Sequence, residues 1–291
     1  MILKNGSKGK EVIKLQEFLG IDSDGHFGKG TERAVKTWQA NNKLTVDGIV
    51  GPSTWNAMGL ASTDVEESYY ETENCLKIHR HFLPAHEYMT GSNPEYIFLH
   101  HTAGWNNPFR TIDHWGRDSR GRIATEFVLG GQSVKGDDNK YDGVLVQCMP
   151  QGGWGWHLGT GRSDMHQNSV GIEVNNFGWI KDGKTYAGTS ADDLQIVTLD
   201  QPFRGHKTWH RYSDKQIEVL RDWIIWIGER DNIDIRAGLP TLIKTIGVDA
   251  FEYIPEVLRG KCKGLWTHTN VRKDKSDMFP QPELMDMLVS L

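Results

Sequence analysis

The chain is poor in cysteine and has no long hydrophobic run. Only Cys75, Cys148 and Cys262 occur among its 291 residues. So few and so scattered cysteines exclude a disulfide framework and a cysteine-rich zinc cluster. No run of about 18 apolar residues is present, and the first residues, MILKNGSKGK, lack the apolar core of a signal peptide. We therefore expect a protein made in the cytosol, with no signal peptide and no membrane anchor of its own.

An excess of positive charge is also missing. The chain has 33 Lys and Arg against 38 Asp and Glu, which gives a net charge of −5. This is the wrong sign for a protein that neutralises many phosphates, so nucleic acid is not the expected partner. Tryptophan (11) and histidine (12) are abundant. Because indole rings offer flat stacking surfaces and imidazoles bind metals and transfer protons, the composition favours a polar polymer as substrate.

The first 60 residues contain an internal repeat. Residues 24–31 and 47–54 both read Asp-Gly-x-apolar-Gly-x-x-Thr. Asp-Gly makes a tight turn, the apolar residue points inward, and the second glycine precedes a helix. Together with apolar residues at helical spacing, the repeat predicts three short amphipathic helices over residues 2–60. A generic small helical domain would fit the same pattern. The acidic, polar residues 61–74 are typical of a linker.

From about residue 75 the pattern changes to alternating strands and helices. Apolar runs predict strands, and helical spacing predicts helices with Ser213 as an N-cap. The expected strands are 95–102, 124–129, 144–148 and 169–174, and the expected helices are 109–118 and 213–230. This order predicts an α+β or mixed α/β fold, with a central mixed sheet flanked by helices. Residues 181–212 are expected to be a surface insertion that shapes a cleft.

Two segments carry side chains that can bind a metal. His100 and His101 end the first expected strand, and successive side chains of a strand face opposite ways, so only one of them can enter a given site. Far downstream, residues 267–277 combine His268 with several cations and two acids. Alone, that segment is also typical of a solvated charged loop. Three ligands of the His, Asp, Glu or Cys type are what a zinc hydrolase requires.

Four segments together resemble the type 2 N-acetylmuramoyl-L-alanine amidases, whose fold is shared with peptidoglycan recognition proteins and many phage endolysins. They are IFLHHTAG at 97–104, GWHLG at 155–159, NSVGIEVN at 168–175, and His268 with Lys275-x-Asp277. Residues 2–60 resemble the peptidoglycan-binding domain 1 family through LKNGSKGKEVIKLQEFLG, DGHFGKGTERAVKTWQ and LTVDGIVGPSTWNAMG. The resemblances imply a wall-binding three-helix domain at 1–60, a linker at 61–74 and a zinc amidase domain at 75–291.

The amidase resemblance also implies roles for single residues. Zinc (Zn2+) would be held by His100, His268 and Asp277, the last of which is a cysteine in many relatives. Glu173 would take a proton from water, and Lys275 would stabilise the oxyanion that forms on the amide carbonyl. The implied substrate-binding residues are His157, Thr125, Glu126 and Trp156.

Some residues depart from the family pattern. Thr125 stands where some relatives carry a tyrosine, and Glu126 where many carry histidine or asparagine, so Glu126 is either a buried partner of another polar group or a second acid near the cleft. Residues 278–280, Met-Phe-Pro, replace the usual Pro-Gly. Asp274 is therefore a rival to Asp277 as ligand, and Lys273 a rival to Lys275.

The function that the resemblance implies is zinc-dependent hydrolysis of the amide between N-acetylmuramic acid and L-alanine in peptidoglycan. A monomeric phage endolysin fits best, held in the host cytoplasm until a separate membrane-permeabilising protein releases it to the wall and periplasm. Two alternatives stay open, namely a non-catalytic peptidoglycan-binding protein and a zinc peptidase that acts on the stem peptide.

Overall fold

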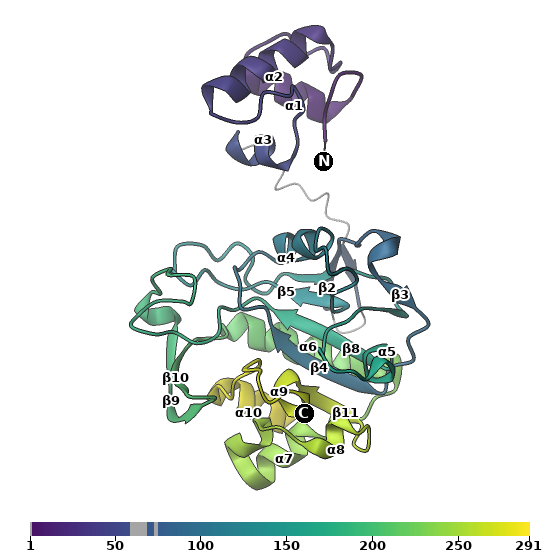
Figure 1. Ribbon diagram of the computed structural model, residues 1–291, viewed down its shortest axis with the longest axis vertical. Helices are drawn as coiled ribbons and strands as arrows, with labels where there is room; N and C mark the ends of the chain where they lie inside the picture. Colours follow the sequence, from purple (N-terminus) through teal and green to yellow (C-terminus); the bar gives the residue numbers. More distant parts are fainter. Residues whose placement is uncertain (1, 59–68, 73–74) are drawn as a thin grey trace. The chain divides into compact units, whose positions relative to one another are not determined.

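The computed structural model describes residues 2–58, 69–72 and 75–291, which fall into two compact units (Figure 1). The N-terminal unit is Met1–Glu67 and the C-terminal unit is Ser68–Leu291. Most of the expected linker, 61–74, lies outside the described residues. At its C-terminal end, however, Tyr69–Glu71 form strand β1, which pairs with the next strand along the chain. The expectation of a linker is therefore corrected for these three residues.

The N-terminal unit has the three helices that its repeat predicts. They are α1 Lys10–Leu19, α2 Lys29–Asn41 and α3 Pro52–Ala57. Phe27 and Val50, the apolar residues of the two repeat copies, are buried, which confirms that they point inward. They join a small core that includes Val12, Leu15 and Val35.

A buried glutamine closes each repeat copy. The Gln16 side-chain amide donates to Asp24 Oδ1 at 2.8 Å and to Thr31 Oγ1 at 3.1 Å, and its Oε1 accepts from the Gly25 backbone N–H at 2.9 Å. Gln39 makes the same three kinds of contact in the second copy, at 2.9, 3.2 and 2.9 Å. Because a buried amide must be fully hydrogen-bonded, the Asp, Gly and Thr of the motif act as partners of this glutamine.

The C-terminal unit is built on a seven-stranded mixed sheet, as the sequence predicts. Its strand order is β1-β2-β6-β5-β8-β4-β11. The central strands β5, β8, β4 and β11 run parallel, whereas β5–β6 and β1–β2 are antiparallel. The remaining strands span β2 Lys77–Arg80, β4 Tyr96–His101, β5 Phe127–Leu129, β6 Leu145–Gln147, β8 Ser169–Val174 and β11 Gly264–Thr267.

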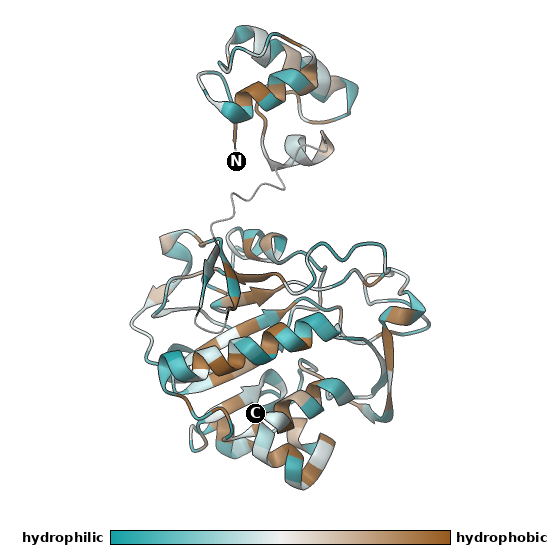
Figure 2. Cartoon of the chain, turned by 180° about the vertical axis from the view of Figure 1, so that it is seen from behind, coloured by the Kyte–Doolittle hydropathy of each residue, from teal (hydrophilic) through white to brown (hydrophobic). Residues whose placement is uncertain are grey.

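Helices cover both faces of this sheet. The longest, α6 Asp214–Asp231, lies across one face (Figure 2), and Ser213 caps it through a capping box with Gln216. Phe127 and Leu129 of β5 pack in the core on the α6 side, whereas Val128 packs with Ile112 of helix α4. The other helices are α4 Pro108–Trp115, α5 Ser163–Gln167, α7 Leu239–Ile246, α8 Pro255–Leu258, α9 His268–Val271 and α10 Pro282–Ser290. Among the described residues, no helix combines the length and apolar character needed to span a membrane.

Short elements complete the unit. Strands β3 Met89–Thr90 and β7 Gly153–Trp154 form one small pair, and single turns of 3-10 helix lie at Ala85–Glu87, Asp193–Gln195 and Gly247–Phe251. The expected insertion 181–212 contains the hairpin of β9 Ile196–Phe203 and β10 His206–His210. Because Trp209 and Tyr212 of this segment are buried in the main core, it is more than a surface addition.

Candidate metal centre and cleft

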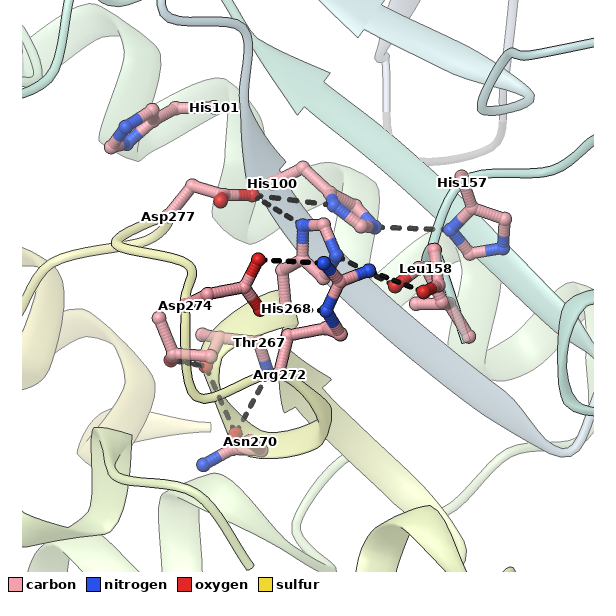
Figure 3. A network of polar contacts seen from close by, with 12 residues as sticks. His100, His101, His157, Leu158, Thr267, His268, Asn270, Arg272, Asp274 and Asp277 are labelled. Atoms are coloured by element: carbon pink, nitrogen blue, oxygen red, sulfur yellow. Dashed lines mark hydrogen bonds and ion pairs between the residues drawn. The ribbon is translucent and has the colours of Figure 1, made fainter. Parts of the chain in front are cut away.

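The register of two parallel strands places the first candidate residues. His100 of β4 pairs with Glu173 of β8. Partners in a sheet project to the same face, so both side chains lie on one side, away from α6. His101 projects to the other face, where its Nδ1 lies 2.7 Å from the Tyr212 hydroxyl. Figure 3 shows His101 turned away from the site that His100 enters.

Two further buried side chains converge on His100. His268 begins α9 directly after β11, the strand next to β4, and Asp277 follows in a loop. The Asp277 Oδ2 atom lies 2.9 Å from His268 Nδ1 and 3.4 Å from His100 Nδ1. One ligand atom from each of the three residues lies within 4.8 Å of the others (Figure 3). This spacing and this donor set suit a zinc ion.

The hydrogen bonds of His268 leave a free lone pair in this cluster. Its Nε2 lies 2.9 Å from the Leu158 carbonyl oxygen, which can only accept a hydrogen bond. The proton of a neutral His268 ring therefore sits on Nε2, and Nδ1 is left without one. A metal ligand needs this arrangement, in which a backbone carbonyl fixes the tautomer of the ring.

A chain of hydrogen bonds gives His100 the same tautomer. The Ser169 hydroxyl donates to the His166 carbonyl oxygen at 3.2 Å, so it accepts from His157 Nε2 at 2.9 Å. His157 Nδ1 is then an acceptor for His100 Nε2–H, at 3.0 Å. The His100 Nδ1 atom is left deprotonated and buried without a hydrogen-bond partner. Burial, together with the neighbouring His268, lowers the pKa of His100 to about 4. An orphaned, neutral nitrogen aimed at a carboxylate fits a bound cation.

Gly171 makes room for the His157 ring in this series of hydrogen bonds. A Cβ atom on Gly171 would lie 2.7 Å from Thr125 Cγ2 and 3.0 Å from His157 Nδ1. Only glycine therefore allows the His157 ring to rest on β8 and reach His100.

The rivals of the proposed ligand and lysine are engaged elsewhere. Asp274 forms a two-point ion pair with Arg272, at 2.6 and 2.7 Å, which lowers the pKa of Asp274 to about 2. Lys273 Nζ lies 4.9 Å from the centre of the Tyr253 ring. Lys275 lines the cleft, as does the paired Asp274. Asp277, rather than Asp274, thus joins His100 and His268 in the cluster, and Lys275, rather than Lys273, is among the residues that line the cleft.

Glu173 lines the cleft together with Asp274 and Asp277. One of its oxygens, Oε2, is buried without a hydrogen-bond partner. Burial raises the pKa of Glu173 well above its usual value, the negative charge of Asp277 adds to the effect, and Lys275 opposes it. A carboxyl group with a raised pKa can accept and return a proton near neutral pH, as a general acid–base group must.

The cleft has a volume of about 370 Å³. The predicted residues Thr125, His157 and Trp156 line it, together with His268, Asp277, Glu173 and Lys275. Trp115, Arg120 and Ile123 line it too, although sequence reasoning assigned them no role.

The structure does not bring Glu126 to the cleft, so its predicted place beside the substrate is corrected. Glu126 is buried and forms an ion pair with Arg230 of α6, at 2.8 and 3.1 Å, and its Oε1 also accepts from Gln147 Nε2 at 2.9 Å. The physical reason is local. Thr125 Oγ1 donates to the Phe127 carbonyl oxygen, and the strand expected over 124–129 begins only at Phe127. Strict alternation therefore does not hold at Glu126.

A buried His, His and Asp set in an open cleft, with an acid and a lysine beside it, is typical of a metal-dependent hydrolase. The sequence model of the N-acetylmuramoyl-L-alanine amidase family matches residues 90–277, and the chain belongs to this family. A second family, described as a peptidoglycan binding domain, matches residues 8–58.

Several known proteins are similar to parts of the chain. An uncharacterized protein in the bpoA1 3' region of Kitasatospora aureofaciens is 40% identical over 53 residues, which are 18% of this chain and 45% of that protein. The Burkholderia AP3 phage endolysin is 36% identical over 20% of this chain and 24% of its own, with a TM-score of 0.20. PlyL is 13% identical over 67% of this chain and 84% of its own, with a TM-score of 0.38. The chain thus spans less than half the length of the first two relatives.

Proposed function

We propose that this protein hydrolyses the amide bond between N-acetylmuramic acid and L-alanine in bacterial peptidoglycan, with a zinc ion held by His100, His268 and Asp277. The observation that carries the proposal is the convergence of three ligand atoms within 4.8 Å in a chain of the amidase family. The orphaned His100 Nδ1 atom supports it, because a buried acceptor without a partner is costly unless a cation binds it. A bound zinc ion would supply Lewis acidity, which polarises a carbonyl and eases ionisation of water.

The remaining roles belong to side chains of the cleft. Glu173, with its raised pKa, takes a proton from the attacking water and returns it to the leaving amine of L-alanine. The Lys275 ammonium group stabilises the negative charge that develops on the carbonyl oxygen. His157 lines the cleft and holds His100 in one tautomer. The side chains of Trp156 and Thr125 contact the substrate.

We further assign wall binding to residues 1–60 and hydrolysis to residues 75–291. The match of residues 8–58 to a peptidoglycan binding domain supports the first assignment. Tethering to a polymer raises the local concentration of enzyme at its surface, so the N-terminal unit favours action on intact walls. In this proposal the protein is a monomeric phage endolysin that lyses the host wall after release from the cytoplasm.

Mass spectrometry of digested peptidoglycan tests the reaction. The amidase produces stem peptides with a free L-alanine amino terminus and leaves the glycan strands intact. A peptidase would instead create new amino termini within the stem peptide, and a binding protein would release nothing. Zinc is tested by chelation: activity should disappear on dialysis against a chelator and return when Zn2+ is restored. Metal-free protein with undiminished activity would refute the role of zinc.

A further inference from the structure

Some of the exposed aromatic side chains lie in the cleft or beside it. In the described part of the C-terminal unit, the strongly exposed aromatic residues are Phe82, Trp105, Trp156 and Tyr186, with exposed fractions of 48, 49, 37 and 58%. Single exposed apolar residues are ordinary, whereas a cluster marks a binding surface. Trp156 lines the cleft, the Tyr186 hydroxyl is hydrogen-bonded to Ala103 of its lining, and Trp105 follows Ala103 by two residues in the sequence. This distribution points to a ligand that extends beyond the cleft.

Trp105 and Tyr186 come from distant segments and share one support. Both rings contact Phe177, which is 2% exposed, with centroid distances of 5.0 Å for Trp105 and 6.2 Å for Tyr186. The Tyr186 hydroxyl donates to the Ala103 carbonyl oxygen at 2.7 Å, and Ala103 lines the cleft. We call Trp105, Phe177 and Tyr186 the aromatic platform. It continues the cleft wall onto the expected insertion 181–212.

The platform is fixed in place by hydrogen bonds and packing. The Asn175 side chain, directly after β8, donates to the Trp105 carbonyl oxygen at 2.5 Å. Lys135 Nζ lies 5.9 Å from the Trp105 ring centre. A rigid aromatic surface binds with little loss of conformational freedom, because few side-chain rotations remain to be frozen. Such a surface is suited to a flat, rigid ligand.

We propose that the aromatic platform binds a pyranose ring of the glycan strand, next to the muramoyl unit whose amide lies in the cleft. This inference rests on the proposed function. The scissile amide joins a peptide to a sugar, so a glycan branch must leave the cleft when the amide lies at the metal centre. A pyranose ring presents apolar C–H groups on its face and hydroxyl groups at its edge. Aromatic faces carry partial negative charge and pair with such C–H groups, while Lys135 offers a hydrogen-bond donor beside them.

Two substrates with the same peptide and different glycan lengths test the proposal. One is N-acetylmuramoyl-tripeptide, which has a single sugar, and the other is a tetrasaccharide of alternating N-acetylglucosamine and N-acetylmuramoyl-peptide. Trp105→Ala should raise KM for the tetrasaccharide about five- to tenfold, the range expected for one lost ring contact, with kcat unchanged. KM for the single-sugar substrate should change less than about twofold, because that substrate does not reach the platform. Trp105→Phe, which keeps a ring, should recover part of the loss.

Controls separate the platform from a general loss of structure. Tyr186→Leu should act like Trp105→Ala, whereas Leu194→Ala, at an 80% exposed position of the same segment, should leave both KM values unchanged. Equal effects of Trp105→Ala on both substrates, or no effect on either, would overturn the proposal. If KM instead followed the length of the peptide, the platform would bind the stem peptide and the proposal would be wrong.

A binding experiment keeps this test independent of the proposed reaction. If the unaltered protein cleaves neither substrate, the proposed function fails, and calorimetry with a tetramer of N-acetylglucosamine still examines the platform. Binding by the full chain that Trp105→Ala weakens by about fivefold or more supports the inference. Binding that is absent, or equal in both proteins, refutes it.

Discussion

An aromatic stack holds the loop that carries Asp277. The Phe279 ring lies between Trp209 and Tyr212, with centroid distances of 4.5 and 4.7 Å and interplanar angles of 17 and 20°. All three rings are almost completely buried. Because Phe279 is only two residues from Asp277, we predict that this stack sets the position of Asp277, the third proposed ligand. Phe279→Ala tests the prediction.

The expected effects are large and separable. Loss of a fully buried phenylalanine ring costs about 3–5 kcal/mol of unfolding free energy. Loosening the support of a ligand lowers metal affinity by about 10- to 100-fold. Phe127→Ala is the matched control, because Phe127 is equally buried but packs against Trp223 and Trp226 of α6. It should lower stability by a similar amount and leave the zinc affinity unchanged.

The assay is a competition for zinc between the protein and a chromophoric chelator, at a temperature where circular dichroism shows each variant to be folded. Substitution with Co2+ adds a second readout, since its visible absorption reports the geometry of the ligands. Phe279→Ala should weaken zinc binding and alter the Co2+ spectrum, and Phe127→Ala should do neither. The reasoning is refuted if both variants bind zinc like the unaltered protein, or if both lose affinity equally.

Three further predictions concern single side chains. Glu173→Gln should keep zinc but lower kcat about 100-fold or more, as for a lost general base, and near-normal turnover would exclude that role. Arg230→Met should cost about 3–5 kcal/mol in urea unfolding, because it leaves Glu126 charged and unpaired, and adding Glu126→Gln should restore much of that loss. Gln39→Ala should destabilise the N-terminal unit by about 1–3 kcal/mol and weaken wall binding, while hydrolysis of soluble muropeptides stays unchanged.

Local patterns were enough to predict much of the fold. The strand at 169–174 and the helix capped by Ser213 have the expected positions, because apolar alternation and a capping residue act within a few residues of sequence. The repeat likewise predicted the buried Phe27 and Val50. The mixed sheet followed from the order of strands and helices.

Contacts between distant segments could not be read from the sequence. Nothing in the motif shows that Arg272 engages Asp274, which leaves Asp277 for the metal centre. For Glu126 the structure bears out the alternative of a buried partner of another polar group, but the identity of that partner, Arg230, 104 residues away, could not be read from the sequence. The cysteines illustrate the limit of composition. Cys148 is buried, Cys262 is partly buried and Cys75 is exposed, since a lone small side chain carries no positional signal.

Buried histidines should make the metal-free protein sensitive to acid. Burial lowers the pKa of His210 to about 3, and its Nδ1 accepts a hydrogen bond from the Phe177 backbone N–H at 3.1 Å. The folded state keeps this ring neutral, whereas the unfolded chain takes up a proton below about pH 6.5. Its contribution to stability is therefore complete above pH 6.5 and is lost as the pH falls towards 3, by an amount on the order of 5 kcal/mol.

His210→Asn tests this reasoning, because the asparagine oxygen can still accept from Phe177 while the titrating group is removed. Urea unfolding of chelator-treated protein at pH 7, 6, 5 and 4 gives the dependence of unfolding free energy on pH. Between pH 6 and 4, the unfolding free energy of the unaltered protein should fall more steeply with falling pH than that of His210→Asn. The difference in slope should correspond to about one additional proton taken up on unfolding. His114→Asn, at an exposed position, should follow the unaltered protein. Parallel curves for His210→Asn and the unaltered protein would mean that His210 is already protonated in the folded state or solvated there, against the burial that the structure shows.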